Sequence, residues 1–247
     1  MSEEMPRRAF IEKTATLAGT VAAAGALGAP ALAQSQSQTQ AQSPSPGGVP
    51  MTYTPKKLPF DPGRIKGMSE KLLVSHYENN YGGAVKRLNA IGEQLASLDF
   101  DKAPVFVVNG LKREELIATN SMILHELFFD GLGGEGQPGG ALAEALNRDF
   151  GSVARWRSEF TAVGRALGGG SGWVMLSYSP RDRRLVNQWA SDHTTNLAAG
   201  RPILVMDMYE HAYHMDYGAA AAKYVDAFMQ VIRWDNVARL HGEAQRA

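Results

Sequence analysis

The chain places a carboxylate and two imidazoles within eight residues, in the segment from Asp207 to His214. This segment directly follows the apolar run of residues 203–206, which is typical of a buried strand. Asp207 should therefore lie at the end of that strand, where a buried carboxylate is unfavourable unless it is paired or bound to a cation. His211 follows four residues later, within reach of the same cation.

Two further histidines, His76 and His125, lie upstream of residue 190, each in an apolar helical pattern. With Asp207 and His211 they make three imidazoles and one carboxylate, a ligand set suited to a redox-active transition metal. Each residue also has a simpler interpretation, because a lone helical histidine is more often packed or exposed, and an aspartate can cap a turn. The metal hypothesis therefore depends on all four residues together.

The composition excludes several other kinds of site. Formal net charge is +0 at pH 7, so nothing indicates a surface for nucleic acid or another polyanion. The chain has no cysteine, which excludes disulfides, thiolate metal sites, iron–sulfur clusters and cysteine nucleophiles. Histidine and carboxylate side chains remain as metal ligands.

The first residues have the features of a targeting segment. Arg7 and Arg8 precede an Ala/Gly-rich run at residues 14–32, and Ala31-Leu32-Ala33 resembles a signal-peptidase site. We predict a twin-arginine-type signal peptide over residues 1–33, and hence a periplasmic or extracellular protein. A cytoplasmic amphipathic tail and a membrane anchor are the alternatives, and an uncleaved signal would itself be such an anchor.

Composition also predicts how the rest of the chain is divided. Residues 34–53 are rich in Ser, Gln and Pro, so we expect a disordered linker there. The folded part should comprise an N-terminal α-helical hairpin domain, residues 54–135, and a C-terminal α/β metal-binding domain, residues 136–247. The Gly/Pro-rich stretch at residues 131–140 marks the boundary between them.

Periodicity predicts the elements that position the candidate ligands. Residues 68–98 should form a helix pair or one bent helix, capped by Ser69 and interrupted at Gly82-Gly83, and residues 113–129 a second helix. Shorter helices are expected at 141–150 and 152–164, strands at 173–179, 185–190 and 202–207, and closing helices at 217–239. The fold class is therefore α+β, a long-helix hairpin followed by a three-stranded antiparallel sheet flanked by helices.

Residues 57–240 resemble the iron/manganese superoxide dismutase family. The segment Asp207-Met208-Tyr209-Glu210-His211-Ala212-Tyr213 matches the family pattern Asp-x-Trp-Glu-His-Ala-Tyr except at Tyr209. The resemblance implies one iron or manganese ion per subunit, held by His76, His125, Asp207 and His211, that converts superoxide to dioxygen and hydrogen peroxide. Further family landmarks occur in the same order, at Leu142-Ala143-Glu144-Ala145, Phe150-Gly151-Ser152 and Gly170-Ser171-Gly172-Trp173.

The resemblance also implies an assembly. Glu210 matches a residue that crosses a dimer interface and orients the ligand histidine of the other subunit, so we expect a homodimer or a dimer of dimers. Trp173 matches the aromatic wall of the metal pocket, although a plain core tryptophan is an equal alternative.

Several positions around the expected metal depart from the family pattern. A histidine four residues after the first ligand and a tyrosine eight residues after it are replaced by Asn80 and Ala84, neither of which supplies an ionisable proton near neutral pH. The tyrosine that usually follows the last ligand by three residues is His214. We hypothesise that Asn80 still hydrogen-bonds to His214 of the partner subunit.

The amide that usually contacts the metal-bound solvent is also missing. Ser121 occupies the position from which iron forms supply a glutamine, and His193 occupies the position used in manganese forms. An imidazole at His193 could tune that solvent and deliver the first proton, or it could be an ordinary loop histidine. Neither position selects iron over manganese.

These observations predict a superoxide dismutase that takes a small anionic substrate and contacts no membrane apart from an uncleaved signal. The altered residues leave a second hypothesis open, a catalytically weak or inactive metal-binding protein on the same scaffold. A metal-dependent hydrolase is disfavoured, because apart from His193 the sequence offers no candidate general base.

Overall fold

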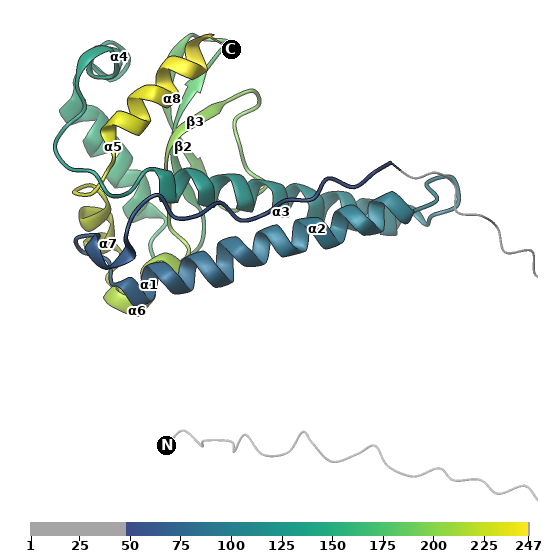
Figure 1. The fold of residues 1–247 in the computed structure, drawn as a ribbon. Helices are drawn as coiled ribbons and strands as arrows, with labels where there is room; N and C mark the ends of the chain where they lie inside the picture. The colour runs from purple at the N-terminus through teal and green to yellow at the C-terminus, as the bar shows by residue number, and fades with distance from the viewer. Residues whose placement is uncertain (1–47, 247) are drawn as a thin grey trace, which may run out of the picture. The chain divides into compact units, whose positions relative to one another are not determined.

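The computed structural model describes residues 48–246 (Figure 1). The predicted signal peptide, residues 1–33, and most of the predicted linker lie outside the described residues. The described residues fall into one compact unit. The predicted boundary at residue 135 stays a prediction.

The first long helix is continuous but changes type along its length. After a short turn at η1, Pro62–Arg64, the helix runs through α1, Glu70–Ser75, a π-helical segment η2, His76–Tyr81, and α2, Gly82–Ser97. The Ser69 hydroxyl caps α1 by accepting a hydrogen bond from the Leu72 N–H at 3.1 Å, as predicted. Gly82-Gly83 does not break the helix, and the irregular segment is instead η2, which begins at His76.

The second long helix, α3, spans Val105–Asp130 and lies beside α2 as a hairpin (Figure 1). The predicted start at residue 113 was wrong by eight residues. Val105 and Phe106 are 84% and 74% exposed, so the first turns of α3 have no buried stripe to produce an amphipathic pattern. The hairpin brings His76, in η2, close to His125, near the end of α3.

The second half of the described chain is an antiparallel sheet covered by helices, which confirms the predicted α+β class. The strands β1, Trp173–Ser179, β2, Arg184–Ala190, and β3, Arg201–Asp207, pair in the order β2-β1-β3. Every residue of the central strand β1 is buried, as expected where both faces of a sheet are covered. The register places Trp173 opposite both Asp207 and Ala190, so the start of β1 and the ends of β2 and β3 lie at the same end of the sheet.

Helices before and after the sheet complete this layer (Figure 1). They are α4, Gly140–Phe150, α5, Val153–Ala166, the short η3, Glu210–Ala212, α6, His214–Tyr217, α7, Ala221–Phe228, and α8, Trp234–Arg246. An isolated bridge between Leu132 and Ile232 ties the glycine-rich connection to the C-terminal helices. Within residues 48–246, no helix has the length and apolar character required to span a membrane.

Candidate metal centre

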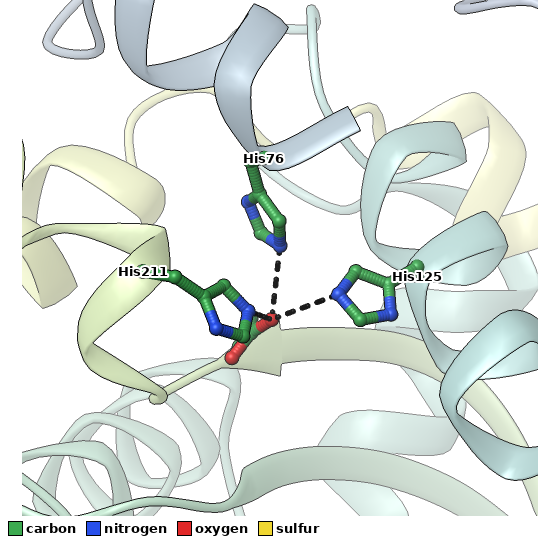
Figure 2. A group of neighbouring side chains, drawn as sticks. His76, His125 and His211 are labelled. Carbon is green, nitrogen blue, oxygen red and sulfur yellow. Dashed lines mark hydrogen bonds and ion pairs between the residues drawn. The ribbon is translucent and has the colours of Figure 1, made fainter. Parts of the chain in front are cut away.

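Four side chains from distant parts of the sequence converge on one point (Figure 2). One ligand atom from each of His76, His125, Asp207 and His211 lies within 4.8 Å of the other three. The Nε2 atoms of His76, His211 and His125 lie 3.1, 3.0 and 3.6 Å from Asp207 Oδ2. All but His211 are buried, so the group is closed to bulk solvent on most sides.

Each ligand candidate is positioned by a different element. His76 begins η2, His125 lies near the end of α3, and Asp207 ends β3. The chain then turns into η3, which holds His211. In that turn the Tyr209 N–H donates to Asp207 Oδ1 at 2.8 Å, which leaves Oδ2 facing the three imidazoles.

The hydrogen bonds of His125 test whether the group suits a cation. His125 Nδ1 lies 2.6 Å from the carbonyl oxygen of Ser121, which can only accept, so Nδ1 carries the proton. Nε2 therefore presents a lone pair, yet it is buried and has no hydrogen-bond partner among residues 48–246. A buried unpaired acceptor is unfavourable, and a bound cation would satisfy it. The residues present therefore fit a metal ion.

The charge states agree with this test. Burial lowers the pKa of His125 to about 3 and also lowers the pKa of His76, so both imidazoles are neutral near pH 7. Burial alone would raise the pKa of Asp207, but the neighbouring His211 and His76 hold it well below its usual range. The site thus combines these two neutral imidazoles and His211 with one carboxylate, donors that suit iron or manganese.

Two aromatic residues and His193 line one side of the group. Trp173 Nε1–H donates to His193 Nδ1 at 3.0 Å, and the Trp173 ring meets His125 edge-on with centroids 5.2 Å apart. The Tyr209 ring stacks on His193 with centroids 4.9 Å apart and planes 13° apart. It also stacks on His211 at 5.3 Å and 16°. Sequence reasoning treated Tyr209 only as a departure from a pattern and missed this sandwich.

Known proteins are similar to most of this chain. The family of iron/manganese superoxide dismutases, C-terminal domain, matches residues 138–240. A protein of Cupriavidus metallidurans named superoxide dismutase [Fe] is 67% identical over 196 residues, 79% of this chain and 100% of that protein. The chain belongs to the iron/manganese superoxide dismutase family. Superoxide dismutase [Mn] 2 of Haloferax volcanii is 34% identical over 78% of this chain and 98% of its own.

The family assignment confirms the predicted activity, which converts superoxide to dioxygen and hydrogen peroxide. A dismutase of Aquifex pyrophilus, named superoxide dismutase [Fe], is 34% identical over 75% of this chain and 90% of its own length. Relatives named for iron and for manganese thus both occur. These similarities favour an enzyme over the metal-retaining scaffold that the sequence left open.

In this dismutase, a pocket of about 230 Å³ opens onto the metal group. Asn80 and Ala84 line it, so the two positions that depart from the family pattern border the approach to the ligands. His193 and Ser121 also line the pocket, and the Ser121 hydroxyl lies 3.4 Å from His125 Nδ1. The remaining lining residues are Asn79, Gly83, Arg87, Ile117, Ala118, His125 and His211.

The residues expected at a dimer interface lie on the surface of the dismutase. Glu210 and His214 are exposed; Glu210 begins the short η3 that holds His211, and His214 follows η3 by two residues. Asn80 is half-buried on η2, in the wall of the pocket. Their predicted contacts with a partner subunit stay predictions.

Proposed function

We propose that His76, His125, Asp207 and His211 hold one iron ion per subunit, and that His193 is the proton donor of this dismutase. The observation that carries the proposal is the convergence of three Nε2 atoms on Asp207 Oδ2, with His125 Nε2 otherwise unpaired among the described residues. When bound, the ion would supply the one-electron chemistry that oxidises one superoxide and reduces another. Iron is favoured over manganese because the relative that is 67% identical is named for iron.

The chain's own residues would bind the ion and control protons. Asp207 would supply the negative charge that offsets the cation, and neutral His76 would carry its proton on Nδ1, which leaves Nε2, 3.1 Å from Asp207 Oδ2, free to bind the ion. The Trp173 N–H can only donate, so neutral His193 accepts at Nδ1 and carries its proton on Nε2. Burial lowers the pKa of His193, which keeps the ring neutral and able to donate.

The metal proposal is tested by elemental analysis of natively purified protein. We expect about one iron per subunit, because the four ligands come from a single chain. His125→Ala should lose the metal and the activity together. His241→Gln, which removes a buried histidine outside the group, should retain both. Stoichiometric manganese would contradict the choice of iron, and metal retention in His125→Ala would contradict the ligand set.

We further propose a homodimer in which Glu210 contacts His211 of the partner subunit and Asn80 contacts His214 of the partner subunit. The exposure of Glu210 and His214, in and beside η3, supports this arrangement. Sedimentation velocity should give a dimer whose dissociation constant rises in Glu210→Ala. A dimer of unchanged affinity in both Glu210→Ala and Asn80→Leu would contradict the proposed interface.

We also propose that the protein is exported to the periplasm or beyond through the twin-arginine pair Arg7-Arg8. The dismutase that is 67% identical is matched over its whole length by 79% of this chain, which leaves room for an additional targeting segment. Changing both Arg7 and Arg8 to Lys should retain the protein in the cytoplasm. Cell fractionation measures this, and export of the variant at the normal level would contradict the proposal.

A further inference from the structure

The wall of the metal pocket contains one positively charged side chain, Arg87, which has no role in the dismutase chemistry described above. His76, Asn80, Ala84 and Arg87 follow one another at helical spacings of four, four and three residues, so they share one face of the first long helix. All but His76 line the pocket. Arg87 is the only lysine or arginine among the lining residues of the described chain.

Arg87 lies at the end of the pocket farthest from the imidazoles. The first helix places it about 16 Å beyond His76 along the axis. The facing wall comes from α3, where Ile117, Ala118 and Ser121 lead inward to His125. Because α2 and α3 form a hairpin, residues far from His76 on one helix face residues far from His125 on the other (Figure 1).

An acidic residue of α3 pairs with Arg87 at this outer end. Glu114 Oε2 lies 3.7 Å from Arg87 Nη1, and the two side chains are 41% and 62% exposed. A pair this long and this exposed is weak, so the guanidinium remains available to another anion. Glu114 nevertheless reduces the positive potential that an approaching anion meets.

The side chains between Arg87 and the metal ligands are small. Ala84 has a single side-chain carbon, Gly83 has no side chain, and Asn80 is uncharged. No described lining residue therefore places an acidic group between Arg87 and the ligands.

We propose that Arg87 is the residue that captures superoxide at the mouth of the pocket, and that Glu114 limits this capture by pairing with it. Superoxide is a small monoanion, and a cleft with one sign of charge concentrates ions of the opposite sign and raises their association rate. Arg87 thus acts on substrate entry, before either electron transfer. This role is independent of which metal the site holds.

A charge series at Arg87 tests the proposal. In metal-loaded enzyme at low ionic strength, Arg87→Gln should lower kcat/KM about two- to threefold, the effect of removing one unit charge acting through water. Arg87→Glu should lower it by about the square of that factor, and Arg87→Lys should change it little. The dependence of kcat/KM on ionic strength should flatten in Arg87→Gln, because salt screens the interaction that was removed.

Lys86 provides the matched control, because it precedes Arg87 on the same helix, is exposed and does not line the pocket. Lys86→Gln changes the net charge by the same amount and should leave kcat/KM within experimental error. If Lys86→Gln and Arg87→Gln lowered kcat/KM equally, the effect would come from net charge alone, and the proposal would be overturned. Equal metal content in all variants, measured first, separates this outcome from a failure of the metal site.

Two further measurements separate capture from turnover. Glu114→Gln should raise kcat/KM at low ionic strength, because it frees Arg87. Azide, a small anion, should bind Arg87→Gln about two- to threefold more weakly in an equilibrium titration that involves no turnover. Unchanged azide affinity in Arg87→Gln, or a lower kcat/KM in Glu114→Gln, would contradict the proposal.

Discussion

The hydrogen bond from Trp173 to His193 determines where the proton of that imidazole lies. An indole N–H cannot accept, so the neutral ring keeps its proton on Nε2. Tyr209 stacks against the same ring and against His211, which restricts the tilt of both imidazoles. Asn120 Nδ2 donates to the His193 carbonyl at 2.6 Å and fixes the backbone as well. The His193 ring is therefore held in a defined orientation with its N–H at Nε2.

The proton-donor role proposed for His193 predicts different results for two substitutions. His193→Gln retains an N–H that can donate, whereas His193→Leu does not. We expect His193→Leu to lose at least about tenfold in turnover and His193→Gln to lose less, because a positioned proton donor contributes on the order of a hundredfold or more. Both variants should keep their metal, since His193 is outside the ligand group. Equal turnover in the two variants would contradict the donor role.

Ala84 tests whether protons limit turnover. Its side chain is 8% exposed and lines a pocket of about 230 Å³, which leaves room for a larger residue. Ala84→Tyr places a phenol where the family pattern has one, and it should raise turnover measured at saturating superoxide. Ala84→Phe fills the same space without the hydroxyl and serves as the control. An unchanged or lower rate in Ala84→Tyr, or equal rates in the two variants, would count against a proton limitation.

At the scale of elements, Asp149 joins the helical layer to the edge strand of the sheet. It lies near the end of α4 and accepts a hydrogen bond from the Leu185 N–H at 2.7 Å. Its own carbonyl accepts from Arg184 Nη2 at 2.8 Å. Burial by itself would raise the pKa of Asp149, but the bonds from Arg148 and Leu185 hold it below its ordinary value.

This depressed pKa predicts the direction of one pH effect. The stabilisation is present above the ordinary carboxyl pKa and is lost as pH falls through the lower folded pKa. Asp149→Asn should therefore reduce the free energy of unfolding by about 1–3 kcal/mol at pH 7, and by less in acid. Asp226→Asn, which removes an exposed ion pair with Arg165, should change it by under about 1 kcal/mol. Denaturant unfolding measures both, and a loss in Asp149→Asn that grows with acid would contradict the assignment.

The elements themselves were predicted with uneven success. The three strands were predicted within one residue at each end, because short apolar runs bounded by turn residues have sharp limits. The start of α3 was missed, because its exposed first turns carry apolar residues without helical periodicity. The π-helical segment η2 was also missed, since its register depends on what the helix packs against.

At the scale of the whole molecule, the metal group links parts of the chain that are distant in sequence. His76 and His125 come from the helical hairpin, and Asp207 and His211 come from the sheet and the segment after it. A ligand that binds only the folded arrangement stabilises it in proportion to the logarithm of its concentration over its dissociation constant. The bound ion should therefore stabilise the entire fold.

Metal removal tests this coupling. Metal-free protein should melt about 6–16 °C below the loaded protein, since the ion would add about 3–4 kcal/mol and each kcal/mol shifts the melting temperature by about 2–4 °C in a chain of this size. The metal-free protein should regain the higher melting temperature when metal is restored. His125→Ala should show no response to added metal in the same calorimetric scan. Equal melting temperatures with and without metal in the unmodified protein would contradict a site that spans the fold.

The sequence alone determined the candidate ligands, the strands and the family, because the types and order of residues are sufficient for pattern and resemblance. The tertiary structure decided what each ligand faces. It showed that Asp207 Oδ2 points at three Nε2 atoms, that His125 Nε2 lacks another partner among residues 48–246, and that Tyr209 is stacked between two imidazoles. These properties arise from contacts between segments far apart in the chain, and local spacing carries no information about such contacts.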